Sequence, residues 1–192
     1  MSDLVADEWV VQVAEQTDIP ERALASYAGA AIALRAEQPE CGLGWNTLAG
    51  IGEVETGHGT YGGAEIGDDG RAEPEIVGPV LDGGDGVAEI PDTDGGELDG
   101  DERWDRAVGP MQFIPSTWEA WSQDGTGDGS LDVHHIDDAA LTAAAYLCGQ
   151  DEDMTTDNGW NAAVNAYNRS VAYAVDVAGA AEQYARDSES TE

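Results

Sequence analysis

The segment WNTLAGIGEVETG, residues 45–57, is the stretch that decides the fold class. Trp45, Leu48 and Ile51 recur at the spacing of a helix that buries one face. The pattern ends at Gly57, which opens the glycine-rich run GHGTYGG. Because glycine commonly follows the last turn of a helix, we predict a helix over about residues 45–56.

This helix carries two acids, Glu53 and Glu55, that helical geometry separates. At about 100° per residue, Glu55 lies on the same apolar stripe as Leu48, Ile51 and Gly52, whereas Glu53 projects into solvent. Burial on that stripe would raise the pKa of Glu55 and hold it protonated near neutral pH, as a general acid requires. The alternative is a rim glutamate that extends into water where the helix frays.

The rest of the chain is predicted to be mostly helical around this segment. A first helix is expected over 3–17, and a second begins at Asp18 as its cap, with Pro20 in the first turn and Glu21 at the capping-box position. A short helix opened by Ser116 is expected next. Further helices are expected at about 137–149, 159–167 and 171–186.

Residues 62–103 differ from the predicted helices. Glycine, acidic residues and proline dominate this segment, and its apolar residues do not recur at helical spacing. The apolar runs EIVGPVL (75–81) and VAEI (87–90) are candidates for short strands. A stretch so long and irregular usually carries function or moves. We therefore expect one mainly α domain over 1–192, with a long irregular loop and short β excursion.

The amino-acid composition excludes some classes of binding partner for this protein. Of 192 residues, 40 are Asp or Glu and 7 are Arg, with no Lys, which gives a net charge of -33. Phosphate-mediated binding of nucleic acid and binding to an anionic membrane are thereby excluded, and no apolar run is long enough to span a membrane. Such a surface opposes self-association, so a monomer is expected, and it fits either a high-salt habitat or selection for extreme charge.

The two cysteines, Cys41 and Cys148, lie 107 positions apart, and neither has a neighbour at metal-ligand spacing. Two buried thiols and a disulfide both remain open, and export would favour the disulfide. The N-terminal MSDLVADEWV has no signal-peptide pattern. The chain is therefore expected to be either cytosolic or the mature form of an exported protein.

The segment DGTGDGSLDVHHIDDAA, residues 124–140, alternates oxygen-bearing side chains with glycines. Asp124, Thr126 and Asp128 offer side-chain oxygens and Ser130 its carbonyl, in the manner of an EF-hand loop. Position twelve of that loop is His135 instead of glutamate, so the closing acid must come from further along. The alternative is a solvated Asp-Gly turn without an ion.

Three motifs, taken in their order along the chain, indicate a protein family. They are GIGEVETGHGTYGG (50–63), AVGPMQFIPSTW (107–118) and AYNRSVAYA (166–174), with IPDTDGGELDGD (90–101) between the first two. Over roughly residues 18–186 the chain resembles the lytic murein transglycosylases, and it looks closest to the membrane-bound-B-type branch as found in actinobacteria. The resemblance implies a lysozyme-like helical fold, peptidoglycan glycan strands as substrate and a location outside the cell or in its wall.

The same resemblance implies a role for each motif residue. Glu55 matches the single catalytic glutamate, which protonates the oxygen between N-acetylmuramic acid and N-acetylglucosamine. It then acts as base while the C6 hydroxyl attacks C1, which gives a 1,6-anhydro product. Gln112 matches a glutamine that hydrogen-bonds near the scissile sugar, and Tyr167 and Asn168 match a pair at the cleft floor. Packing roles for Gln112 and Tyr167 stay open.

Aromatic side chains and the metal loop complete the expected site. Phe113, Trp104, Trp118 and Trp121 are candidates to stack on sugar rings, and we expect no more than one or two of them to touch glycan. In the loop at 124–138, Asp138 matches the late aspartate that closes a variant calcium site in this branch, and Asp132 would help through water. The calcium ion would be structural.

Two other functions stay open at this stage. A hydrolytic muramidase would use water in place of the C6 hydroxyl. A catalytically idle glycan-binding domain would need no acid at Glu55.

Overall fold

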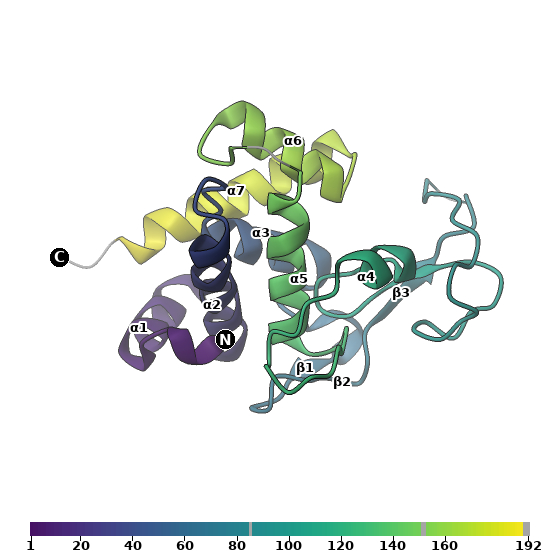
Figure 1. Ribbon diagram of the computed structural model, residues 1–192, viewed down its shortest axis with the longest axis horizontal. Coiled ribbons are helices and arrows are strands. Elements are labelled where there is room, and N and C mark those ends of the chain that lie inside the picture. The colour runs from purple at the N-terminus through teal and green to yellow at the C-terminus, as the bar shows by residue number, and fades with distance from the viewer. Residues whose placement is uncertain (85, 151–152, 190–192) are drawn as a thin grey trace.

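The computed structural model describes residues 1–84, 86–150 and 153–189. Within these residues the fold is mainly α, as predicted, and its strands are few and short (Figure 1). The helices are α1 (Asp7–Thr17), α2 (Glu21–Glu37), α3 (Trp45–Thr56), α4 (Pro115–Trp121), α5 (Ile136–Cys148), α6 (Asp157–Tyr167) and α7 (Val171–Ser188), with short 3-10 turns η1 (Ser2–Leu4) and η2 (Tyr61–Gly63). None of the described helices is long and apolar enough to cross a membrane.

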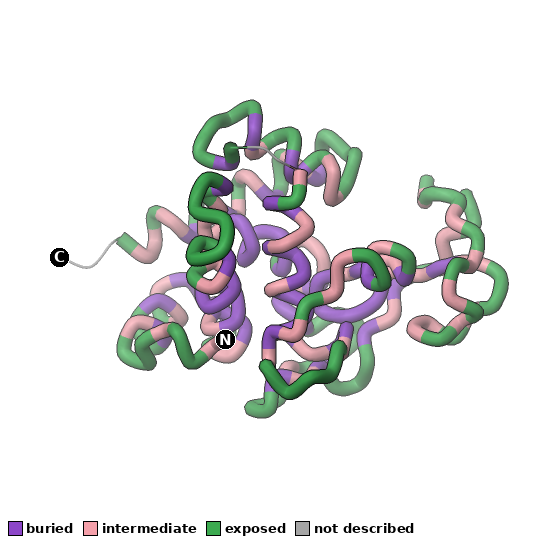
Figure 2. Tube along the Cα trace, in the orientation of Figure 1, coloured by how far each residue is buried: buried purple, intermediate pink, exposed green. Residues whose placement is uncertain are grey.

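Helix α3 lies at the centre of the fold and packs against α2, α5 and α7. Leu48 and Ile51 on its apolar stripe are fully buried, and Figure 2 shows the buried segments gathered in these central helices. Gly50 lets α7 approach closely, since a Cβ there would lie 2.8 Å from the Val177 carbonyl oxygen. The observed bounds Trp45–Thr56 confirm the helix predicted from the sequence.

Two predicted helix starts were wrong. Asp18 does not cap α2: its left-handed backbone, with φ of 58°, ends α1, and its N–H donates to the Ala14 carbonyl. Helix α4 begins at Pro115 and not at Ser116. Proline suits the first helical position, because its fixed φ is helical and its missing N–H would be unpaired there anyway.

The irregular segment forms two small antiparallel pairs, shown beside α4 and α5 in Figure 1. Strand β1 (Glu65–Ile66) pairs with β2 (Ala72–Glu73), and β3 (Val77–Val80) pairs with β4 (Arg106–Val108). The EIVGPVL run does supply β3. The VAEI run forms no named strand and contributes only an isolated bridge, Asp82 to Glu89.

Acidic side chains organise the loop between β3 and β4. Asp92 accepts hydrogen bonds from the N–H groups of Asp94, Gly95 and Gly96, at 2.8–3.2 Å. Asp105 is fully buried and accepts from both the backbone and the hydroxyl of Thr93. Some of the chain's many acids therefore serve as acceptors for backbone N–H groups, in place of strand partners.

A disulfide joins Cys41, in the loop before α3, to Cys148, the last residue of α5. The two Cα atoms lie 5.5 Å apart and both residues are buried. Of the two states left open by the sequence, the structure has the disulfide.

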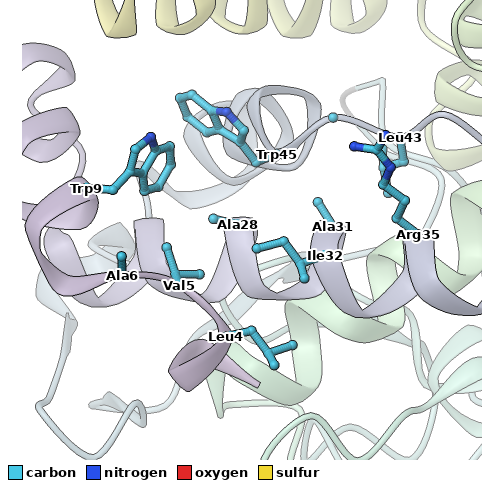
Figure 3. Close-up of a pocket in the computed structure, with 11 residues that line it drawn as sticks. Leu4, Val5, Ala6, Trp9, Ala28, Ala31, Ile32, Arg35, Leu43 and Trp45 are labelled. Carbon is cyan, nitrogen blue, oxygen red and sulfur yellow. The ribbon is translucent and has the colours of Figure 1, made fainter.

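An apolar groove of about 450 Å³ lies between η1, α1, α2 and the start of α3. Figure 3 shows Trp9 and Trp45 on one wall, Ile32 of α2 facing them across the groove, and Arg35 further along the same helix. The ring centroids of Trp9 and Trp45 are 5.5 Å apart in an edge-on arrangement. None of the residues that line this groove belongs to the candidate active site described below.

Candidate active site

Glu55 is the penultimate residue of α3 and is partly buried. One carboxylate oxygen, Oε1, accepts a hydrogen bond of 2.7 Å from the Tyr173 hydroxyl of α7. Burial raises the pKa of Glu55 to about 7, although the Tyr173 hydrogen bond acts in the opposite direction. Glu55 therefore keeps its proton to a higher pH than an exposed glutamate does.

Glu53 lies on the other side of the same helix, and its side chain is 48% exposed. The divergence of the two acids follows the helical geometry predicted from the sequence. Burial raises the pKa of Glu55 and the Tyr173 hydrogen bond opposes this rise, with no contribution from a second carboxylate among the described residues. Of the two acids of α3, Glu55 is thus the partly buried one and Glu53 the exposed one.

The end of α3 is fixed, which argues against a frayed helix with Glu55 at its rim. The N–H groups of Gly57 and His58 donate to the carbonyls of Glu53 and Gly52, at 2.9 and 3.0 Å. These bonds satisfy carbonyls that would otherwise end the helix without partners. The Thr56 hydroxyl also donates to the Pro110 carbonyl at 2.7 Å, which ties α3 to the turn that carries Gln112.

Gln112 lies in a tight turn closed by two hydrogen bonds between Val108 and Phe113, of 2.8 and 2.9 Å. Its backbone is left-handed, with φ of 51°, and its amide Nε2 donates to the Gly109 carbonyl at 3.0 Å. A non-glycine residue in this conformation is strained by about 1–3 kcal/mol, and such strain clusters at functional sites. The geometry thus agrees with a functional role for Gln112, while its amide nitrogen already has a backbone partner.

Burial is the main cause that raises the pKa of the Tyr167 phenol. The negative charge of Glu55 raises this pKa further, which indicates that the two side chains lie near each other. Its hydroxyl, however, donates to the Met111 carbonyl at 2.8 Å and not to the glutamate. Tyr167 lines a small cavity of about 60 Å³ with Gln112 and Tyr146. The structure therefore places Tyr167 beside the predicted sugar-contacting residue Gln112.

Phe113 and Asn168 have structural roles that differ from those expected. Phe113 is 3% exposed, and its ring packs against Trp118 and Tyr167 at centroid distances of 5.6 and 5.8 Å. Little of the Phe113 ring is exposed, although it lines the same small cavity as Gln112 and Tyr167, so contact of Phe113 with a sugar stays a prediction. Asn168 is exposed, and its side-chain oxygen accepts from the Ser170 N–H, which shapes the turn between α6 and α7. Among the stacking candidates, Trp118 is also buried, whereas Trp104 and Trp121 keep part of their surface exposed.

Tyr173 is the residue that sequence reasoning missed. It belongs to the AYNRSVAYA run, but the tyrosine of that run that the sequence analysis placed in the site was Tyr167. Ser170 caps α7 by accepting from the Tyr173 N–H, so Tyr173 lies in the first turn of that helix. The sequence does contain a possible capping serine, Ser170, three residues before Tyr173. Only the packing of α7 against α3 shows that Tyr173 is the side chain that hydrogen-bonds to Glu55.

The loop at 124–138 is held by carboxylates that accept from its own backbone. Asp138, at the start of α5, accepts from the N–H groups of Gly125, Thr126 and Asp132 at 2.8–3.1 Å. Asp124 accepts from Thr126 and from the N–H groups of Gly127 and Gly129. Asp138 therefore joins the start of α5 to this loop through backbone N–H groups, and its predicted role as a calcium ligand stays a prediction.

Of the other predicted ligands, Asp128 and Ser130 are exposed and Thr126 is half-buried. Asp128 accepts from the Ser130 N–H at 2.7 Å, and Thr126 accepts from the Asp128 N–H at 3.2 Å. Among the described residues, the one group of three acids with oxygens within 4.8 Å of one another is Asp92, Asp94 and Asp105. The carboxylates at 124–138 do not converge in this way, so calcium binding there stays a prediction.

Comparison with known proteins bears on the C-terminal part of the chain. Residues 97–183 match the family model described as the transglycosylase SLT domain. No curated protein and no solved structure matches the chain. The matched range covers less than half of the chain and includes Gln112, Tyr167 and Tyr173, but not α3 with Glu55. The match and the mainly α architecture agree with a lysozyme-like transglycosylase domain, and residues 97–183 are similar to that domain.

Proposed function

We propose that the protein is a lytic transglycosylase of the membrane-bound-B type, which cleaves the β-1,4 bond between N-acetylmuramic acid and N-acetylglucosamine in peptidoglycan. The observation that carries the proposal is Glu55, a lone glutamic acid whose pKa is raised to about 7 and whose carboxylate is held by Tyr173. On this proposal the protein works as a monomer in the cell wall.

The first chemical step uses the proton of Glu55. The protonated carboxyl group donates its proton to the glycosidic oxygen as the bond between that oxygen and C1 breaks. The leaving N-acetylglucosamine takes the bonding electrons and the proton. A pKa near the working pH suits this role, because the acid is both present and strong enough to donate.

The second step returns a proton to Glu55. The carboxylate accepts the proton of the C6 hydroxyl, and the freed oxygen bonds to C1, which closes the 1,6-anhydro ring. Because the nucleophile belongs to the substrate, one carboxylate suffices where ordinary glycosidases use two. The Tyr173 hydrogen bond stabilises the carboxylate between the two steps.

The mass of the products tests this function against its alternatives. Purified peptidoglycan digested with the protein should yield anhydromuropeptides, each lighter by one water than the corresponding reducing product. Reducing ends instead would support the hydrolytic muramidase. Glycan binding without any cleavage would support a catalytically idle domain.

Substituting Tyr173→Phe should move the pH dependence of cleavage. Without the phenolic hydroxyl the carboxylate of Glu55 loses a stabilising hydrogen bond, so its pKa rises further. The alkaline limb of kcat, where the general acid loses its proton, should therefore move to higher pH. At neutral pH we expect kcat to fall on the order of tenfold, since the carboxyl group is also less well oriented.

The matched control is Tyr61→Phe, because Tyr61 is 51% exposed. Its pH profile should equal that of the wild type. An alkaline limb in Tyr173→Phe that stays in place or moves to lower pH would refute the assigned role of this hydrogen bond.

We also propose that the loop at 124–138 binds a structural calcium ion through Asp124, Thr126, Asp128, Ser130 and Asp138. The support is the position of Asp138, which reaches from α5 into the loop, and the hard oxygen donors around it. Burial raises the pKa of Asp138 despite three backbone hydrogen bonds, so a nearby cation would stabilise its charged form.

Millimolar calcium should raise the melting temperature on the order of 5 °C relative to chelator. The increment should vanish in Asp138→Asn and persist in Asp92→Asn, which alters the other acidic group. Differential scanning calorimetry measures both. Equal melting temperatures with calcium and with chelator in the wild type, or an increment lost only in Asp92→Asn, would remove the site at 124–138.

A further inference from the structure

A second set of ionisable side chains surrounds His58, two residues after the end of α3. The His58 ring stands between two phenols: Nδ1 is 3.2 Å from the Tyr27 hydroxyl of α2, and Nε2 is 2.9 Å from the Tyr184 hydroxyl of α7. Nε2 also lies 3.2 Å from a carboxylate oxygen of Glu53. Tyr27, His58 and Tyr184 are all buried, and the mechanism above uses none of them.

The direction of these hydrogen bonds follows from the ionisation of each group. Burial keeps Tyr27 protonated by raising its pKa, and burial lowers the pKa of His58 to about 4. The Glu53 carboxylate oxygen beside Nε2 can only accept, so we place the ring hydrogen on Nε2, and Nδ1 of the neutral ring accepts from the Tyr27 hydroxyl. That hydrogen points to Tyr184 and Glu53, and the Tyr184 hydroxyl in turn donates to Glu53.

The backbone around His58 is shaped to allow this arrangement. His58 has a left-handed conformation, with φ of 58°, which costs a non-glycine residue about 1–2 kcal/mol. Gly52 leaves room for the phenol of Tyr27, since a Cβ at Gly52 would overlap the Tyr27 hydroxyl. The strained histidine is thus held in place by its side chain, which bonds to α2 and α7 at once.

Helix α7 contacts the end of α3 through two phenols. Tyr173 binds Glu55, and Tyr184 binds His58 just after the helix end. Eleven residues separate them, about three helical turns, so both lie on nearly the same face of α7. The position of Glu55 relative to Tyr173 therefore depends on how firmly His58 and Tyr184 join α3 to α7.

We propose that His58, held between Tyr27 and Tyr184, is a positioning residue that keeps the last turn of α3 in register with α7, so that the Glu55 carboxyl group stays desolvated and bonded to Tyr173. This inference rests on the proposed role of Glu55. An imidazole suits the position because it accepts at one nitrogen and donates at the other, in opposite directions. Its neutral form is required, because a protonated ring cannot accept from Tyr27.

The test measures the pKa of Glu55 directly, by a nuclear magnetic resonance titration with glutamate labelled at the side-chain carboxyl carbon. The signal of Glu55 is assigned by its absence from Glu55→Gln. His58→Gly removes the ring and relieves the left-handed strain, and Tyr184→Phe removes one hydroxyl only. Tyr61→Phe is the matched control on an exposed tyrosine.

In His58→Gly and Tyr184→Phe the end of α3 should loosen and admit water to Glu55. Its pKa should then fall from about 7 toward 4.5, by about half a unit or more. On peptidoglycan, kcat should fall on the order of tenfold with KM nearly unchanged, because substrate binding is not altered. The alkaline limb of kcat should move to lower pH, opposite to the shift expected for Tyr173→Phe.

Added imidazole should restore part of the Glu55 pKa and of kcat in His58→Gly, because His58 lines a cavity of about 700 Å³ through which the base can enter. A folded Tyr184→Phe in which Glu55 titrates as in the wild type would overturn the inference, even if His58→Gly fails to fold. If the wild type cleaves no peptidoglycan yet the pKa of Glu55 moves in the variants, the proposed function fails while the positioning role stands.

Discussion

Replacing Glu55 with glutamine should lower the rate of peptidoglycan cleavage on the order of a thousandfold, within the range that general acid–base catalysis supplies. Glutamine has nearly the same shape and still fills the space beside Tyr173, but it has no proton to donate and accepts none. The loss should appear in kcat and not in KM, since the sugar contacts remain. Release of muropeptides from purified peptidoglycan measures the rate.

The control for this substitution is Glu37→Gln, at the exposed end of α2, which should cleave at the wild-type rate. Loss of activity in Glu55→Gln counts only if the fold is intact, and stability provides that check. The folded pKa of Glu55 lies above its unfolded value, so the wild type loses stability as the pH rises from about 4.5 through about 7. Glu55→Gln should therefore melt at a higher temperature than the wild type at pH 8 and at a similar one at pH 4. Wild-type cleavage by Glu55→Gln would dismiss Glu55 as the catalytic acid.

Opening the disulfide between Cys41 and Cys148 should destabilise the protein more than any other single change considered. The two cysteines lie 107 positions apart, and closing a loop of that length removes about 4–5 kcal/mol of chain entropy from the unfolded state. For a domain of this size the melting temperature should drop by roughly 10–20 °C. Calorimetry on the double variant Cys41→Ala, Cys148→Ala measures the loss.

The disulfide also matters for the site, because Cys41 lies shortly before α3 and Cys148 ends α5. Below its lowered melting temperature the double variant should still cleave peptidoglycan, since the proposed mechanism uses neither cysteine. A double variant that melts with the wild type would contradict the stabilising role.

The central helix could be predicted from sequence because its signals are local. The spacing of Trp45, Leu48 and Ile51 and the glycine at 57 define α3 without reference to the rest of the chain. The same periodicity separated Glu55 from Glu53, and the structure agrees. The helical spacing could not predict how deeply Glu55 is buried, because that depends on the packing of α7 against α3.

The wrong start predicted for α2 arose because a local pattern can fit two conformations. Asp18, Pro20 and Glu21 make an acceptable capping box, but the buried Ile19 and the left-handed Asp18 end α1 instead. The two-residue strands β1 and β2 are too short to leave a pattern in the sequence.

The hydrogen bond of Tyr173 to Glu55 is a feature of tertiary structure that no sequence pattern predicted. Both phenols lie near the glutamate, and only the packing of α7 on α3 decides that Tyr173 donates to it. The role of His58 has the same origin. A histidine between two glycines looks like part of a loop, and its two phenol partners come from helices far away in the sequence.

The most direct test of the account is the pKa of Glu55 in the free wild-type protein, read from the carboxyl signal that Glu55→Gln lacks. A value near 7 would mean that Glu55 still carries its proton in the folded protein near neutral pH, where it must donate that proton to the glycosidic oxygen. A value near 4.5 would mean that Glu55 is already ionised at neutral pH and has no proton to give, which would contradict the proposed mechanism.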